Sequence, residues 1–114
     1  GMVFAIEPFA STGSGIVQES GEASVFMVAD KKPVRSIITR QVLKEIENYE
    51  GLPFCRRWLT KKFGAKASFA LREMQQLGIV HAYPPLADSN KGLVSQAEHS
   101  VLVDDEIVVL TKLK

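Results

Sequence analysis

PVRSIITRQVLKEIENYEG, residues 33–51, is the stretch where the apolar pattern changes from that of a strand to that of a helix. Its apolar residues recur every three or four positions, as on one face of a helix: Val34, Ile37, Ile38, Val42, Ile46 and Tyr49. The hydroxyl of Ser36 is suited to cap the first turn, and Gly51 is suited to end the helix. The stretch therefore predicts a helix between these two residues.

Short apolar segments precede this helix. Residues 2–10, 15–18 and 23–28 read MVFAIEPFA, GIVQ and ASVFMV, and turns rich in glycine and serine separate them. Such segments are typical of strands. Because they follow one another closely, we expect them to form an antiparallel meander.

Two more helices and three more strands are expected after residue 51. Pro53 suits the first turn of a helix over residues 53–64, and a third helix covers residues 66–78. Their expected apolar positions are Phe54, Trp58 and Leu59 in the second helix and Phe69, Leu71, Met74 and Leu77 in the third. Strands are expected within residues 79–87, 93–103 and 107–112.

Strands on both sides of a helical block indicate an α+β fold in which the block is inserted. The two strands that follow the helices resemble the end of a winged helix-turn-helix unit. We therefore expect three parts: strands over residues 1–30, a helical winged-helix-like insertion over residues 31–87, and closing strands over residues 88–114.

The composition of the 114 residues is that of a globular protein with one modest core. One cysteine excludes an internal disulfide framework. No apolar run approaches the roughly 20 residues that span a bilayer, and no secretory signal pattern is visible, so we expect a cytoplasmic protein.

Positive charge is concentrated in the middle of the chain. Residues 31–72 hold eleven lysines and arginines against three glutamates, whereas the whole chain has a net charge of +1. This asymmetry indicates either a polyanionic partner or an ordinary solvated face of amphipathic helices. The third helix offers only Lys66 and Arg72, beside Glu73, which argues against sequence-specific reading of DNA.

Glu7 lies in an otherwise apolar expected strand, and Glu98 lies in one that alternates small or apolar residues with polar ones. Carboxylates on neighbouring strands are suited to a hard divalent cation or to acid and base roles, although a charge at a strand edge also prevents aggregation. A dinuclear hydrolytic site needs about five or six protein ligands. The four aspartates fall in expected turns, so they are not candidates: Asp30, Asp88, Asp104 and Asp105.

Four motifs together resemble the type II methionine aminopeptidases. They are FAIEPFASTGSG (residues 4–15), GLPFCRRWL (51–59), LGIVHAYPPL (77–86) and QAEHSVLV (96–103), and they occur in the family's order over nearly the whole chain. The resemblance implies the C-terminal part of a pita-bread fold with its helical insertion. It also implies a metallopeptidase that removes the initiator methionine from nascent proteins with two divalent ions, such as cobalt, manganese, iron or zinc.

The resemblance assigns roles to four residues. Glu7 resembles the terminal carboxylate ligand of one metal, and Glu98 resembles the carboxylate that bridges both metals. Tyr83 and Pro53 resemble positions that border the pocket for the methionine side chain. No further catalytic residue is assigned, and Ala97 and Ser100 depart from the aromatic residue and threonine that the family commonly has.

The family's other ligands, two aspartates and a histidine, lie on strands before the match. We therefore expect the isolated chain to bind no metal pair, to be inactive, and to self-associate through unpaired strands. An enzyme of nascent chains works beside ribosomal RNA, so residues 31–72 are expected to make weak contacts with the ribosome or RNA. The rival interpretation is a non-catalytic pita-bread relative that binds RNA or protein.

Overall fold

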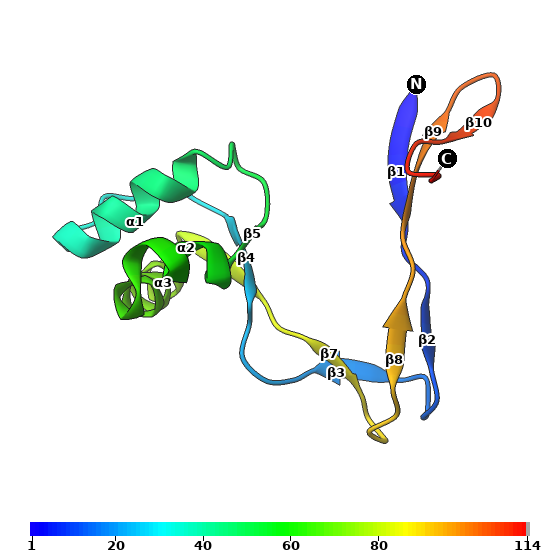
Figure 1. The fold of residues 1–114 in the computed structure, drawn as a ribbon, viewed down its shortest axis with the longest axis horizontal. Helices are drawn as coiled ribbons and strands as arrows, with labels where there is room; N and C mark the ends of the chain where they lie inside the picture. Colours follow the sequence, from blue (N-terminus) through cyan, green and yellow to red (C-terminus); the bar gives the residue numbers. More distant parts are fainter. Residues whose placement is uncertain (114) are drawn as a thin grey trace. The chain divides into compact units, whose positions relative to one another are not determined.

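The computed structural model describes residues 1–113, in which strands and helices follow the order β1–β4, α1, β5, α2, α3, β6–β10 (Figure 1). The helices are α1 (Ile37–Glu47), α2 (Arg56–Phe63) and α3 (Ala65–Gln76). The strands are β1 (Met2–Ile6), β2 (Phe9–Ser11), β3 (Val17–Glu19), β4 (Val25–Val28), β5 (Phe54–Cys55), β6 (Val80–Tyr83), β7 (Leu86–Asp88), β8 (Val94–Gln96), β9 (His99–Val103) and β10 (Ile107–Val109). The mixture of helices and strands confirms the α+β prediction.

The chain forms two compact units. Unit 1 contains residues 1–19 and the chain from residue 86 onward, and unit 2 contains residues 20–85. The sequence pattern placed the divisions after residues 30 and 87. Strand β4 lies in unit 2 because it pairs with β5 on one side and β6 on the other.

In unit 1, an N-terminal arm (residues 2–19) pairs antiparallel with a C-terminal arm (residues 86–103), as Figure 1 shows. Strand β1 pairs with β9, β2 with β8, and β3 with β7. One register holds throughout, because each step along one arm is matched by one step along the other: Met2 faces Val103, Phe9 faces Gln96 and Val17 faces Asp88. Strand β10 adds to the free side of β9.

The predicted meander is therefore wrong. The first strands do not pair with one another; each pairs with a strand more than 50 residues away in the sequence. The period of a strand shows which of its residues share a face, but it carries no information on which strand supplies the backbone partners.

Most helices of unit 2 begin close to the residue that the local sequence predicts. Ser36 caps α1, and its Oγ accepts a hydrogen bond from the Thr39 amide at 3.3 Å. Gly64, with a φ of 58°, is the C-cap of α2, and Gly78 follows the end of α3 with a φ of 69°. Helix α1 ends earlier than expected, at Glu47, and Asn48 is its C-cap.

The predicted start of the second helix is wrong. Pro53 does not open a helical turn, because Phe54 and Cys55 form β5 and pair with Phe26 and Val25. The extended backbone places the Phe54 ring in the core, stacked on Phe26 with ring centroids 6.1 Å apart. Helix α2 begins at Arg56 only after this strand pairing is complete.

The hydrophobic core lies in unit 2. Its buried side chains come from all three helices, from the sheet of β5, β4 and β6, and from the segments just before α1 and β6: Phe26, Val34, Val42, Ile46, Phe54, Leu59, Ala67, Ala70, Leu71, Met74, Ile79 and Val80. Phe69 and Leu77, which were expected to lie partly inward, are exposed. Tyr49 packs against Phe54 and Trp58, and burial raises the pKa of its hydroxyl, with a further increase from the nearby Glu45 carboxylate.

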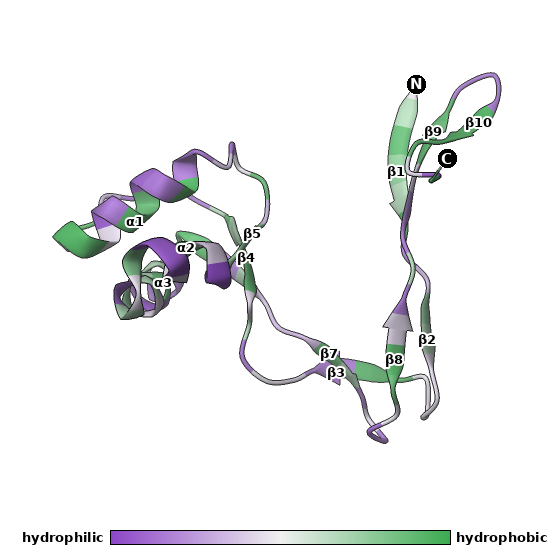
Figure 2. Ribbon diagram, in the orientation of Figure 1, coloured by the Kyte–Doolittle hydropathy of each residue, from purple (hydrophilic) through white to green (hydrophobic). Residues whose placement is uncertain are grey.

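Unit 1 has little buried apolar surface. Of its apolar side chains in the described residues, Val101 is buried, and those of β1 and β10 are exposed. Figure 2 shows apolar colour along β1, β9 and β10. Among residues 1–113, no helix has the length and apolar character needed to cross a membrane.

Candidate functional site

Glu7 and Glu98 lie opposite each other on the two arms of unit 1. Ile6 faces His99 and Phe9 faces Gln96, so the shared register places Glu7 across from Glu98. Pro8 lies between β1 and β2, and because proline has no amide hydrogen it cannot donate to the neighbouring arm. One backbone bond remains at this break, from the Ala97 amide to the Pro8 carbonyl at 3.1 Å.

Both glutamate side chains project from the same face of the paired arms. Residues that face each other in an antiparallel pair have neighbouring side chains, and so do residues two positions away on the same strand. Gln96 donates a side-chain hydrogen bond to Glu7 Oε2 at 3.0 Å, which places Gln96 and Glu7 on one face. In an extended backbone Gln96 and Glu98, two positions apart, have side chains on the same face.

The two carboxylates are exposed and offer oxygen ligands of the kind that hard divalent cations prefer. Within residues 1–113, no cluster of three or more histidine, cysteine, aspartate or glutamate side chains is arranged to hold a metal ion. Two carboxylates are fewer than the roughly five or six protein ligands that a dinuclear site needs. The role of Glu7 and Glu98 as metal ligands stays a prediction.

The two expected substrate-pocket residues lie in unit 2. Tyr83 ends β6, is 41% exposed, and packs edge-on against His81 with ring centroids 4.7 Å apart. Pro53 is exposed directly before β5. The two residues flank opposite sides of β4, because the sheet order is β5-β4-β6. Their role in a methionine pocket stays a prediction.

Asp88 is the polar residue that sequence reasoning missed. It was expected in a surface turn, but it ends β7 and is only 3% exposed. The sequence did contain an indication of a partner for this carboxylate. The segment STGSG of the opposite arm is rich in hydroxyl groups and glycines, and such loops present amides and hydroxyls to an anion.

A cradle of hydrogen bonds surrounds the Asp88 carboxylate. Oδ2 accepts from the Ser11 hydroxyl at 2.8 Å and from the Gly15 amide at 2.9 Å. Oδ1 accepts from the Asn90 amide at 2.8 Å, and from the Ser14 amide and hydroxyl at 3.1 and 3.2 Å. The Ser11 hydrogen bond, followed by the three backbone amides, holds the pKa of Asp88 well below its usual range, although burial opposes this shift.

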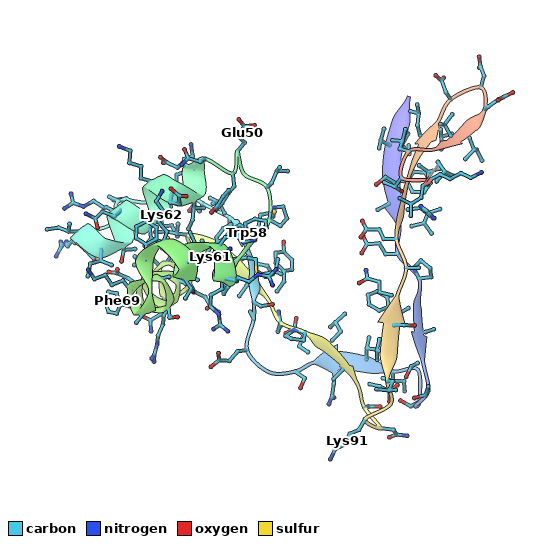
Figure 3. The ribbon with its side chains drawn as sticks, in the orientation of Figure 1. Glu50, Trp58, Lys61, Lys62, Phe69 and Lys91 are labelled. Carbon is cyan, nitrogen blue, oxygen red and sulfur yellow. The ribbon has the colours of Figure 1, made fainter. Side chains whose placement is uncertain are left out.

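Four of the basic residues lie on α2 in unit 2, where Figure 3 labels Lys61 and Lys62. Arg56 is paired with Glu22 at 3.0 Å, and Lys62 with Glu45 at 2.6 Å. Arg57 and Lys61 are exposed and line a shallow hollow of about 460 Å³ together with Ser24, Cys55, Arg56 and Thr60. This part of the chain therefore presents positive charge to solvent.

The chain is similar in sequence to several methionine aminopeptidases. It is 45% identical over 112 residues to the methionine aminopeptidase of Archaeoglobus fulgidus, covering 97% of this chain and 37% of that protein. It is 42% identical over 107 residues to methionine aminopeptidase 2 of Laccaria bicolor, covering 90% of this chain and 30% of that protein. The chain thus spans about a third of the length of these relatives. No protein-family model matches it.

A solved structure of a thermophilic Arx1 shares the fold of this chain. The TM-score is 0.84 at 19% sequence identity, and the match covers 94% of this chain and 29% of the Arx1 chain. At this identity the likeness concerns the fold alone. The sequence matches carry the family relationship: this chain is homologous to a segment of the methionine aminopeptidases, among which the fungal relatives are of type 2.

Proposed function

We propose that this chain is the C-terminal part, with its helical insertion, of a pita-bread enzyme that removes the N-terminal methionine from nascent proteins. The observation that carries the proposal is the identity of 45% over nearly the whole chain to a methionine aminopeptidase. The shared register of the two arms, which places Glu7 across from Glu98, supports it, because two ligands of one metal must lie close together. The winged-helix-like character of the insertion belongs to the same proposal.

Glu7 and Glu98 are the proposed metal ligands of this segment. Two facing carboxylates can hold hard cations such as manganese or cobalt, and the remaining ligands come from the rest of the enzyme. Bound divalent ions supply Lewis acidity, which activates water and polarises a carbonyl group. Gln96 fixes Glu7 through its hydrogen bond and so limits the conformations from which Glu7 presents its oxygens.

Tyr83 and Pro53 are the proposed apolar wall for the methionine side chain. Both are exposed on unit 2, so their rings are accessible to a ligand. An unbranched thioether packs well against such surfaces. In this proposal the two residues bind substrate and take no part in proton transfer.

A chimeric enzyme tests the proposed function. This chain replaces the matching segment of the Archaeoglobus fulgidus methionine aminopeptidase, and hydrolysis of the peptide Met-Ala-Ser is measured with manganese or cobalt. We expect turnover that is lost in Glu7→Gln and Glu98→Gln. The matched control is Glu106→Gln, an exposed carboxylate in the turn between β9 and β10, which should leave turnover unchanged.

Two results would count against the proposal. The first is a folded chimera without turnover. The second is turnover that survives both glutamine substitutions, since the carboxylates would then not be required.

The isolated chain is proposed to lack a complete metal site. Calorimetric titration of the chain with manganese or cobalt should give no tight binding of two ions, because only two facing carboxylates are present. Tight binding of two ions that Glu7→Gln or Glu98→Gln abolishes would show that this segment assembles a complete site without further ligands.

We also propose weak, salt-sensitive contact between the basic face of α2 and the ribosome or RNA. Its support is the exposed charge of Arg57 and Lys61 beside the paired Arg56 and Lys62. Ribosome co-sedimentation should fall when these four residues are changed to glutamate and when salt is raised. The control variant reverses Lys91 and Lys112 in unit 1, and equal loss in both variants would assign the binding to total charge.

A further inference from the structure

Burial alone cannot set the register of the two arms in this chain. Register is strongly specified where one face of a pair is buried, because a slip then exposes the buried side chains. In the described part of unit 1, Val101 is buried, whereas β1, β3 and β10 are exposed along their whole length. Another feature must select the observed alignment.

The Asp88 cradle joins the two arms at defined positions. The carboxylate belongs to the C-terminal arm, and Ser11, Ser14 and Gly15 of the N-terminal arm donate to it at 2.8–3.2 Å. Both oxygens are used, so a shift of either arm would break several bonds at once. An alignment that kept Asp88 buried without these donors would be costly, and an alignment that exposed it would lose the bonds.

Two glycines leave room for the cradle in the observed alignment of the two arms. A Cβ atom on Gly13 would lie 2.3 Å from Asp88 Oδ1. A Cβ atom on Gly92 would lie 2.3 Å from the Gly13 backbone nitrogen. A one-residue slip would bring a side chain into one of these places, because each glycine is flanked by residues that carry a Cβ: Thr12 and Ser14, and Lys91 and Leu93.

We propose that Asp88 is a positioning residue whose cradle sets the register of the two arms and thereby holds Glu7 opposite Glu98. The setting of the register follows from the geometry above, and its importance for metal binding rests on the proposed function. A slip by one residue would turn one glutamate to the other face, where it could not share a ligand with its partner.

Disulfide trapping measures the register directly in the 114-residue chain. With Cys55 changed to serine, one cysteine replaces Glu7 and a second replaces Glu98, Ala97 or His99. The first pair reports the observed register, and the other two pairs report slips by one residue in either direction. Facing residues meet the distance limits of a disulfide, whereas displaced residues do so poorly. Yields are read by mass spectrometry after equilibration in a glutathione buffer.

We expect the Glu7→Cys/Glu98→Cys pair to dominate when Asp88 is present. In Asp88→Ala, the ratio of this disulfide to the slipped disulfides should fall at least about tenfold, which corresponds to a preference of about 1.4 kcal/mol. Asp88→Asn keeps the size of the side chain and some acceptor capacity, and should give an intermediate ratio. Asp105→Asn, an exposed aspartate in the same unit, should leave the ratio unchanged.

An unchanged ratio in Asp88→Ala would overturn the proposal. If all three yields fell together, Asp88 would hold the arms together without selecting their alignment. The assay needs neither metal nor turnover, so failure of the proposed peptidase function would leave its result interpretable.

Discussion

Carboxylates in unit 1 differ in chemistry because their surroundings differ. Glu7 and Glu98 are exposed and keep oxygens available to a ligand, whereas every oxygen of Asp88 already accepts hydrogen bonds from the chain. The partners of Asp88 are hydroxyls and backbone amides without charge. The exposed pair therefore suits binding, and the buried residue suits a structural role.

The Asp88 cradle predicts a specific titration. Because its pKa is lowered in the folded chain, the stability that it contributes is present above the ordinary pKa of about 3.9 and is lost as the pH falls through the lowered pKa. Carboxyl-carbon NMR should give Asp88 a midpoint below that of an ordinary aspartate, and Ser11→Ala should raise it. A midpoint for Asp88 equal to or above the ordinary value would contradict the prediction.

The close packing at Gly13 and Gly92 predicts that a larger side chain at either position destabilises the Asp88 cradle. Gly13→Ala forces a methyl group against the Asp88 carboxylate, and Gly92→Ala forces one against the Gly13 backbone. Each should destabilise unit 1 by about 1–3 kcal/mol, the usual range for overpacking. Amide hydrogen exchange at Gly15 and Asn90 measures the loss. Gly1→Ala, where a Cβ meets nothing within 4 Å, should have no effect; wild-type protection in both cradle variants would refute the close fit.

At the scale of elements, α1 of unit 2 has a side-chain cap, and all three helices share one core. The Ser36 hydroxyl satisfies an amide at the start of α1, and the apolar faces of α1, α2 and α3 meet the sheet of β4–β6. Thr39 is buried in this region and donates a hydrogen bond to Glu73 of α3, which satisfies its hydroxyl. Packing between elements therefore adds to the local preference of each helix.

The core of unit 2 predicts a large difference between two leucines. Leu59 of α2 is 0% exposed and Leu52 is 66% exposed. Leu59→Ala should lower the free energy of unfolding by about 2–5 kcal/mol through lost burial and an unfilled cavity. Leu52→Ala should change it by less than about 0.5 kcal/mol. Denaturant unfolding followed by Trp58 fluorescence compares them, and similar losses would show that the observed packing is not the stabilising one.

Removal of the Ser36 cap of α1 is predicted to lower the free energy of unfolding less than Leu59→Ala does. Ser36→Ala removes the acceptor for the Thr39 amide and should lower the free energy of unfolding of unit 2 by about 1 kcal/mol. Ser68→Ala, at an exposed position inside α3, is the control and should be neutral or slightly stabilising because alanine favours helices. If the two substitutions have equal effects in urea, the cap does not contribute.

At the scale of the whole chain, buried apolar surface is distributed unequally between the two units. Unit 2 contains the hydrophobic cluster, whereas unit 1 exposes apolar side chains on β1 and β10, which are the outer strands of their sheet. Outer strands present unpaired backbone groups that recruit other strands. Unit 1 therefore has the surface that a neighbouring polypeptide would cover.

This surface predicts self-association of the 114-residue chain. Sedimentation velocity at increasing concentration should show dimers or larger species. Val3→Lys on β1 combined with Ile107→Lys on β10 should shift the distribution to monomer, since lysine on an edge strand opposes strand addition. Lys91→Glu at the β7–β8 turn is the control, and a wild-type chain that stays monomeric at high concentration would disprove the prediction.

The sequence by itself determined the features that depend on neighbouring residues. The cap at Ser36, the glycines that follow α2 and α3 and the α+β class were all predictable. Each follows from helical or strand period, or from a backbone conformation that one residue type adopts easily. The start of α2 was not predictable, because pairing of Phe54 with Phe26 overrides the preference of Pro53 for a first helical turn.

Only the tertiary structure decided which strands pair and which carboxylate is buried. Strand partners come from distant parts of the chain, and the alternation within one strand is equally compatible with many partners. Asp88 looks like a turn residue locally, yet donors more than 70 residues away make its burial favourable. The facing pair of Glu7 and Glu98 arises from the same cause: two separate arms are aligned in one register, and no local pattern records that alignment.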